Sequence, residues 1–329
     1  MPDTRSPVVL VLGSHMAPED IVPMSQLAER LGFGELWFSE DCFFTGAMSS
    51  VTAALGATRE LPVGIGIVSA VTRHPALLAM ELAAMSRLYP GRVRPGVGLG
   101  VPLWLDQMGL RPSSPLTALR ECVTTLRRLL AGEEVTVAGD VFAFDRVKLT
   151  YEPHEELPIY MGLVNEKGLR LSGEIADGTV LSVLAGVDYI RWSREQIAEG
   201  MDIGDRSGHH QVTTYVLYSC LRDGAAAKEA LRDVTAFYLE AMPDNALSQV
   251  YGIVDHLGAL LPGGATRIAR EMPAAWLDDL VIAGDPDECA AKLRAFIGAG
   301  SDTIGLWPFP LDQSAEVLGL TAREVLPQL

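Results

Sequence analysis

Short apolar runs alternate with longer amphipathic stretches along most of the chain. The short runs are apolar at consecutive positions, which is typical of parallel strands buried on both faces. The stretches between them predict helices, because their apolar residues recur at helical spacing. The short runs predict eight strands, near Val8–Leu12, Glu35–Ser39, Pro62–Val68, Arg92–Val97, Leu157–Met161, Gly178–Ser182, Val212–Ser219 and Thr303–Trp307.

Start and stop signals delimit three of the helices. Asp20 is a candidate N-cap for a helix over residues 21–31. A second helix is predicted over Pro75–Leu88 and ends before Pro90-Gly91, an ordinary stop signal. A third opens at Ser114, where the following proline suits the first helical turn.

Strict strand–helix alternation with eight strands predicts an α/β fold, a (β/α)8 barrel, as one domain over residues 1–329. Two connections are longer than a plain unit needs. Residues 132–150 alternate like a β-hairpin after strand four, turning at Gly139-Asp140. Residues 222–285 carry about three extra helical patterns, which predicts an insertion between strands seven and eight. The alternative, a doubly wound sheet, requires a glycine-rich loop after strand one, and "LGSHMAPED" lacks one.

Composition narrows the functional classes. The chain is 48% hydrophobic and 21% charged, so it can bury a full core. Its formal charge of −16 argues against nucleic acid as a partner. The apolar run "VVLVLG" is too short for a signal segment or a membrane span, and four scattered cysteines without a CxxC pair suit a reducing compartment. We therefore expect a cytoplasmic protein that binds neither nucleic acid nor membrane.

Chemistry in such a barrel lies at the carboxyl ends of the strands, so the residues just after each strand are the candidates. His15 follows strand one and has two interpretations, as a proton donor or as a structural residue. Glu40 and Asp41 follow strand two, and only one of two adjacent side chains can enter a pocket there. Either carboxylate has two interpretations, as an acid that acts on a substrate or as a helix cap or solvent-facing group.

The glycines of "GVGLGVPLW" after strand four also have two interpretations. Gly96, Gly98 and Gly100 have GxGxG spacing with Pro102 following, which is a weak match to a dinucleotide loop. We favour close packing of a strand and its loop, although the same residues would admit a flat ring. Trp104 follows them, either as a wall of a substrate pocket or as an ordinary packed residue.

The segment "NEKG" after strand five begins a helix. The free N–H groups of its first turn, with Lys167 and Gly168, could hold a phosphate, whereas Glu166 would repel one. No histidine has ligand spacing with acids or cysteines, so no metal site is predicted, and no GxSxG elbow is present.

Several stretches in the same order resemble the bacterial-luciferase-like oxidoreductase family. They are most similar to its coenzyme F420-dependent branch, which includes methylenetetrahydromethanopterin reductase. The resemblance extends over nearly the whole chain, from about Val8 to Ile304. It rests on "VTRHPALLAMELAAMSRLYPGR", "GVGLGVP", "SPLTALRECVTTLRRLLAGE", "LPIYMG", "RLSGEIADGTVLS" and "AGDPDECAAKLRAFIGAGSDTI".

The resemblance implies a barrel with an insertion, usually a homodimer, that binds a flavin or deazaflavin at the strand ends. It implies a cis peptide bond at Gly66–Ile67 behind the ring. It further implies that reduced coenzyme F420 delivers a hydride to an unsaturated or imine-like carbon of a small molecule or peptide. The positions that match the cofactor site are Gly66, Ile67, Ser69, Gly98, Gly100, Val164, Asn165, Lys167, Gly168 and Ser182.

Three departures from the family pattern affect the expected site. Asp41 replaces a histidine that usually follows the acid at Glu40. Asn165-Glu166 replaces a common Gly-Pro, and Leu105 stands where some relatives have a catalytic glutamate. The proton donor is therefore open between Asp41 and His15. The alternatives are an FMN-dependent monooxygenase of the same superfamily and a non-catalytic cofactor-binding relative.

Overall fold

Parallel pairing runs from strand to strand around a closed ring in the computed structural model, which describes residues 5–13 and 16–329. β1 pairs with β2 on one side and with the last barrel strand, β13, on the other, and the pairs β3–β5 and β4–β6 join the remaining ends, so the sheet closes as the predicted barrel and is not an open doubly wound sheet. The strands in ring order are β1 (Val8–Leu12), β2 (Leu36–Phe38), β3 (Val63–Ile65) with β4 (Val68–Ser69), β5 (Val93–Arg94) with β6 (Gly96–Gly98), β9 (Tyr160–Gly162), β10 (Gly178–Leu181), β11 (Gln211–Cys220) and β13 (Thr303–Pro308).

Two of the eight predicted strands are each split into two pieces. The predicted strand over residues 62–68 is interrupted at Gly66–Ile67, whose peptide bond is cis, as expected. The strand over residues 92–97 is interrupted at Pro95, which has no N–H group for the ladder.

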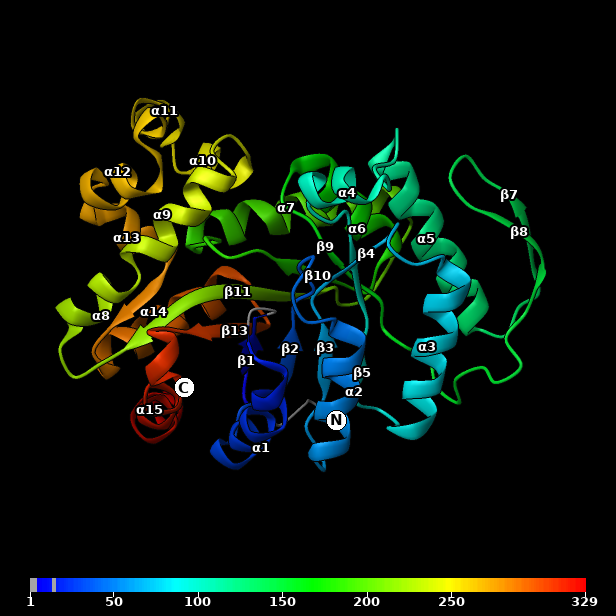
Figure 1. The fold of residues 1–329 in the computed structure, drawn as a ribbon, viewed down its shortest axis with the longest axis horizontal. Coiled ribbons are helices and arrows are strands. Elements are labelled where there is room, and N and C mark those ends of the chain that lie inside the picture. Colours follow the sequence, from blue (N-terminus) through cyan, green and yellow to red (C-terminus); the bar gives the residue numbers. More distant parts are fainter. Residues whose placement is uncertain (1–4, 14–15) are drawn as a thin grey trace.

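Helices cover the outside of the ring (Figure 1). The predicted helices at residues 21–31 and 75–88 have the expected bounds, and Asp20 is the N-cap residue although its side chain makes no capping bond. The helices that follow the eight strands are α1 (Ile21–Leu31), α2 (Ala47–Ala57), α3 (Pro75–Leu88), α5 (Pro115–Leu130), α6 (Glu166–Ile175), α7 (Val187–Ile203), α14 (Pro286–Ala299) and α15 (Ser314–Leu320).

The two predicted extensions are present. The hairpin of β7 (Val135–Ala138) and β8 (Ala143–Val147) turns at Gly139, and Figure 1 shows it projecting beside α5. A short helix α4 (Pro102–Met108) follows β6, in a segment where the sequence pattern predicts a loop.

The insertion contains more elements than the three expected, because its helices are too short to show a clear periodicity. They gather at one side of the barrel mouth in Figure 1. The elements are α8 (Gly224–Ala230), α9 (Arg232–Ala241), α10 (Ala246–Val250), α11 (Val254–Leu260), α12 (Gly264–Glu271), α13 (Ala274–Leu280) and the short strand β12 (Ile282–Gly284), which pairs with β11.

Ile67 occupies a position that only glycines on its neighbouring strands allow. A Cβ atom on Gly98 would lie 2.6 Å from Cδ1 of Ile67, and one on Gly162 would lie 2.8 Å from its Cγ2. A Cβ atom on Gly96 would lie 3.1 Å from Ile67 Cγ2 and still closer to a backbone oxygen. The interpretation of these glycines as close-packing residues is therefore correct for Gly96 and Gly98, and the side chain that they accommodate is Ile67.

His210 is buried at the opposite, amino-terminal edge of the barrel. Its Nε2 lies 2.8 Å from the Thr179 hydroxyl, and only 4% of the residue is exposed. Burial, with added repulsion from Arg194 and Arg206, lowers the pKa of His210 from 6.5 to about 4. The folded protein therefore holds this imidazole neutral.

We expect Gly98→Ala to destabilise the fold by about 1–3 kcal/mol, because the added methyl group overpacks Ile67 and the carbonyl of Gly162. Urea unfolding measures the change. Gly298→Ala in α14 is the matched control, since its Cβ would meet no heavy atom within 4 Å, and it should leave stability equal or higher. Equal stability of the two variants would contradict the packing role of Gly98.

We expect the free energy of unfolding to fall as the pH drops from 6.5 toward 4, in part through His210. In that window the unfolded chain takes up a proton that the folded protein does not. This difference in proton binding lowers the free energy of unfolding by up to about 3 kcal/mol. His210→Gln removes this titration, so its stability should depend less steeply on pH. Chemical denaturation at a series of pH values measures the slope. His154→Gln, at an exposed residue, should keep the wild-type slope.

Candidate active site

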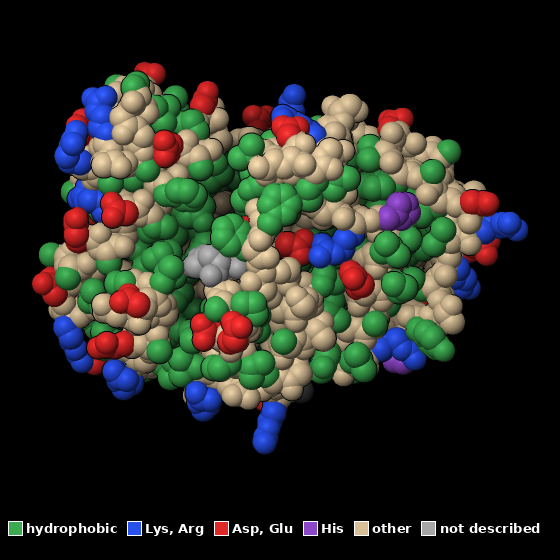
Figure 2. All heavy atoms as spheres, in the orientation of Figure 1, with side chains coloured by type: hydrophobic (Ala, Val, Ile, Leu, Met, Phe, Trp, Pro, Cys, Tyr) green, Lys and Arg blue, Asp and Glu red, His purple; other side chains and the backbone are tan. Residues whose placement is uncertain are grey.

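A cavity of about 890 Å³ opens at the carboxyl ends of the strands and collects residues from distant parts of the chain. Figure 2 shows a hollow between the insertion and the rest of the molecule, with hydrophobic side chains beside it. Of the predicted site residues, the cavity is lined by Glu40, Asp41, Gly66, Ile67, Gly100, Val164, Asn165, Lys167, Gly168 and Ser182. The structure therefore brings together most of the residues that the sequence reading selected.

Glu40 has both carboxylate oxygens occupied. Arg73 donates from Nη1 to Oε1 at 2.6 Å and from Nη2 to Oε2 at 2.9 Å, and the Ala47 N–H at the start of α2 donates to Oε2 at 3.0 Å. The hydrogen bonds that Arg73 donates to Glu40 raise the pKa of Arg73, so the guanidinium stays charged. Of the two interpretations for Glu40, the geometry fits helix capping and ion pairing.

Asp41 lines the cavity as well and is half-buried. The expectation that only one of the two acids enters the pocket was wrong, because β2 ends at Phe38 and strand alternation does not extend to residues 40 and 41. The Ser39 hydroxyl donates to its Oδ2 at 3.5 Å. Asp41 is thus the second acid of this pair that lines the cavity. His15, the other proposed proton donor, lies outside the described residues.

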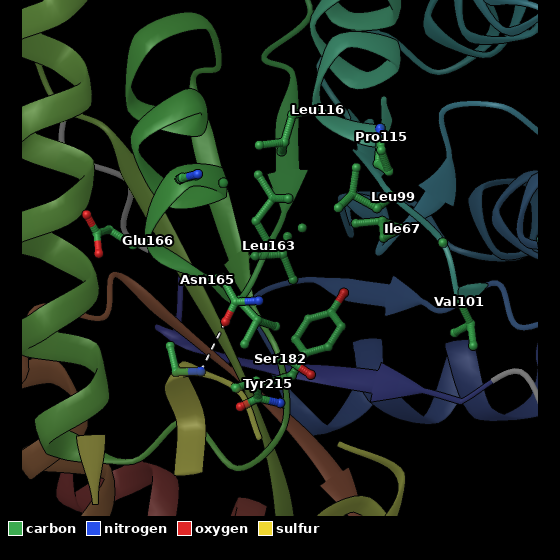
Figure 3. A pocket seen from close by; sticks show the side chains of 18 of the residues that line it. Ile67, Leu99, Val101, Pro115, Leu116, Leu163, Asn165, Glu166, Ser182 and Tyr215 are labelled. Carbon is green, nitrogen blue, oxygen red and sulfur yellow. Dashed lines mark hydrogen bonds between the residues drawn. The ribbon is translucent and has the colours of Figure 1, made fainter. Parts of the chain in front are cut away.

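The apolar part of the cavity lies around Ile67. Ile67 rests on the glycines described above and is itself half-buried, so its side chain also faces the cavity. Figure 3 shows Ile67, Leu99, Pro115, Leu116 and Leu163 gathered in this part of the site. A flat apolar group can lie against such a surface with little exposure to water.

Two residues expected to touch the cofactor lie behind the lining. Ser69 is 8% exposed, and its hydroxyl donates to the Leu99 carbonyl at 3.1 Å. Gly98 lies beneath Ile67. Gly100 does line the cavity, and its φ of +77° together with the closeness of Ser69 favours glycine there.

The start of α6 forms the polar end of the cavity. Lys167 is exposed and lines it, and Gly168 packs against Leu163, where a Cβ atom would lie 2.9 Å away. The Val164 carbonyl accepts a hydrogen bond from the Tyr189 hydroxyl at 2.5 Å, which fixes the approach to the helix. As in any helix, the first N–H groups of α6 have no acceptor within the helix and can serve an anion.

Asn165 joins this helix to the insertion. Its Oδ1 accepts a hydrogen bond from the Ala246 N–H at 3.0 Å, the dashed line in Figure 3. Glu166, which the sequence reading expected to repel an anion, pairs with Arg170 at 2.9 Å. The surroundings of Lys167 are therefore less acidic than the sequence alone suggested.

The sequence did not identify the cavity-lining residues that come from the insertion and from the barrel interior. Asp244, Asn245, Ala246 and Gln249 line the cavity from the insertion, and Tyr215 lines it from β11. Because the insertion follows the carboxyl end of a strand, the sequence indicated that it lies near the site. Its short helices, however, did not indicate which of its residues turn toward the cavity. Trp104, proposed as a wall of the substrate pocket, lies half-buried on α4 and is not among the lining residues.

Among residues 5–13 and 16–329, no group of three or more His, Cys, Asp or Glu side chains could hold a metal ion. The four cysteines are free thiols. Within the same described ranges, no helix is both long enough and apolar enough to cross a membrane.

Comparison with proteins of known sequence and structure identifies relatives along the whole chain. A 5,10-methylenetetrahydromethanopterin reductase from Methanolobus tindarius is 30% identical over 306 residues, covering 90% of this chain and 93% of the relative. An F420-dependent glucose-6-phosphate dehydrogenase from Nakamurella multipartita is 26% identical over 331 residues, covering 95% and 93%.

The fold has a solved counterpart of almost the same extent. The coenzyme F420-dependent tetrahydromethanopterin reductase from Methanopyrus kandleri superposes with a TM-score of 0.82 at 24% identity, covering 98% of this chain and 99% of that one. The profile of the luciferase-like monooxygenases matches residues 4–303. The chain therefore belongs to the luciferase-like monooxygenase family.

Proposed function

We propose that this protein is a coenzyme F420-dependent oxidoreductase that transfers a hydride to an unsaturated or imine-like carbon of a small molecule or peptide. One observation carries the proposal: a single cavity joins the apolar Ile67 surface, the lysine-bearing start of α6 and the acid Asp41. The F420-dependent relatives support the choice of cofactor.

The residues present fit a deazaflavin. A volume of about 890 Å³ has room for such a ring together with a substrate. Ile67 and its apolar neighbours would hold the ring, while Lys167 and the first N–H groups of α6 would hold the anionic chain attached to it. The buried hydroxyl of Tyr215 has no hydrogen-bond partner in the described structure, which also fits a polar ligand group at the cavity floor.

The bound reduced deazaflavin would supply the hydride. The chain's own residues would orient it and exclude water: the Ile67 surface aligns the ring, and the leucine-rich wall keeps the reacting carbon dry. A proton must then reach the atom beside the carbon that receives the hydride. We assign this transfer to the carboxyl group of Asp41, which would take up a proton from solvent and pass it to that atom, because Glu40 is engaged by Arg73 and the start of α2.

Separate calorimetric titrations with coenzyme F420 and with FMN test the proposal. Binding of F420 at micromolar affinity or better, about −8 kcal/mol, would support it. Preference for FMN, with oxygen uptake in the presence of reduced FMN, would instead indicate the monooxygenase alternative. Binding of neither cofactor would refute both and favour the non-catalytic alternative.

We expect Asp41→Asn to slow turnover by about 100-fold while the dissociation constant for F420 stays within about twofold. The amide keeps the size of the side chain but cannot pass on a proton. Stopped-flow measurement of hydride transfer, together with calorimetry, separates the two quantities. Turnover equal to that of the wild type would remove Asp41 from the acid role.

We expect Lys167→Ala to weaken F420 binding by about 5- to 10-fold, with little change in rate at saturating cofactor. Because the side chain is exposed, added salt should reduce this difference. Lys148→Ala, an exposed lysine beyond the hairpin strand β8, is the matched control and should bind F420 like the wild type. Equal affinities of the two variants would contradict the anion-binding role of Lys167.

A further inference from the structure

Tyr215 spans the barrel interior from one side to the other. It belongs to β11, and β3 lies four strand pairings away around the ring of eight, through β13, β1 and β2. Nevertheless, a Cβ atom built on Gly66, directly after β3, would lie 1.7 Å from the Tyr215 hydroxyl oxygen. The hydroxyl therefore touches the bare Cα of Gly66, and no larger residue fits at position 66.

The tyrosine ring is held tightly along its length. A Cβ atom on Gly305 of β13 would lie 2.8 Å from Cδ1 of Tyr215, so the ring also packs against bare backbone near its base. Trp37 meets it edge-on, with ring centroids 6.2 Å apart and planes at 68°. The position of the hydroxyl is thus set by packing on several sides.

The Tyr215 hydroxyl differs from those of Tyr189 and Tyr218. It is buried and has no hydrogen-bond partner in the part of the chain that the structure describes. By contrast, the Tyr189 hydroxyl donates to the Val164 carbonyl, and the Tyr218 hydroxyl lies 2.8 Å from that of Thr321. A buried hydroxyl without a partner lowers stability. Other buried hydroxyls, such as those of Ser219 and Thr235, also lack a partner among the described residues, but those residues do not line the cavity, whereas Tyr215 does.

The hydroxyl is also a competent donor. Burial raises the pKa of Tyr215 well above its usual value of 10, and the charge of Glu35 acts in the same direction. Tyr215 therefore keeps its proton at neutral pH. The residue lines the cavity with Gly66 and Ile67, and Figure 3 shows its hydroxyl turned toward Ile67.

We propose that Tyr215 donates a hydrogen bond from the barrel floor to an acceptor atom, a carbonyl oxygen or ring nitrogen, of the cofactor ring held at Ile67. This inference rests on the proposed function, since the acceptor belongs to the deazaflavin. Reduction increases the electron density of such a ring, so a donor at this point stabilises the reduced form more than the oxidised form. Tyr215 would therefore help to bind the cofactor and raise its reduction potential.

Tyr215→Phe separates this role from a structural one, because it keeps the ring and removes only the hydroxyl. Without cofactor, the variant should unfold at the same temperature as the wild type or higher, since an unsatisfied polar group is gone. Calorimetry should show oxidised F420 binding about 5- to 10-fold more weakly, the loss expected for one hydrogen bond. The reduction potential of the bound cofactor should also fall.

Tyr218→Phe is the matched control on the same strand. Tyr218 points to the other face of β11, where its hydroxyl meets Thr321, so this variant should lose stability and keep the wild-type affinity for F420. Tyr215→Phe protein with wild-type affinity and potential would overturn the inference and leave the proposed function standing. If the wild type itself bound neither F420 nor FMN, the proposed function would fail, and this inference with it.

Discussion

Close packing at the end of the third barrel strand is the constraint on which the candidate site depends. Ile67 can face the cavity because Gly96, Gly98 and Gly162 leave room beneath it. Gly66 in turn leaves room for Tyr215, which comes from the far side of the ring. These contacts involve four of the eight barrel strands, so the apolar surface of the cavity is a product of the closed barrel and of no single loop.

The charged residues around the apolar Ile67 surface fall into two groups, those paired with an arginine and those assigned to proton transfer or anion binding. Glu40 is engaged by Arg73 and the first turn of α2, and Glu166 is paired with Arg170. These carboxylates organise the walls of the cavity. Asp41 and Lys167 also line the cavity, and they carry side chains of opposite charge type. We assign Asp41 to proton transfer and Lys167 to anion binding. A strongly acidic chain can thus offer a local site for an anionic cofactor.

The insertion completes the site and connects its parts. Ala246 at the start of α10 donates to Asn165 at the start of α6, and the Tyr189 N–H donates to the Tyr251 hydroxyl from the insertion. The segment that closes the cavity is therefore bonded to the helix that would hold the cofactor's anionic chain. With the proposed function, the insertion and the start of α6 would form one wall of the cavity, whose lining includes Asp244 and Gln249.

The order of short buried strands and amphipathic helices determined the barrel, because eight parallel strands have few ways to bury both faces. The same pattern located the strand ends and, with them, Asp41 and Lys167, whereas Ile67 was expected in the site only through the family resemblance. The role of Glu40 and the entry of Tyr215 into the site were decided only by the tertiary structure. Their partners, Arg73 and Gly66, lie far away in the sequence, and strand alternation alone does not reveal which face of a strand turns inward. Such contacts between residues distant in the sequence form only when the strands close into the barrel.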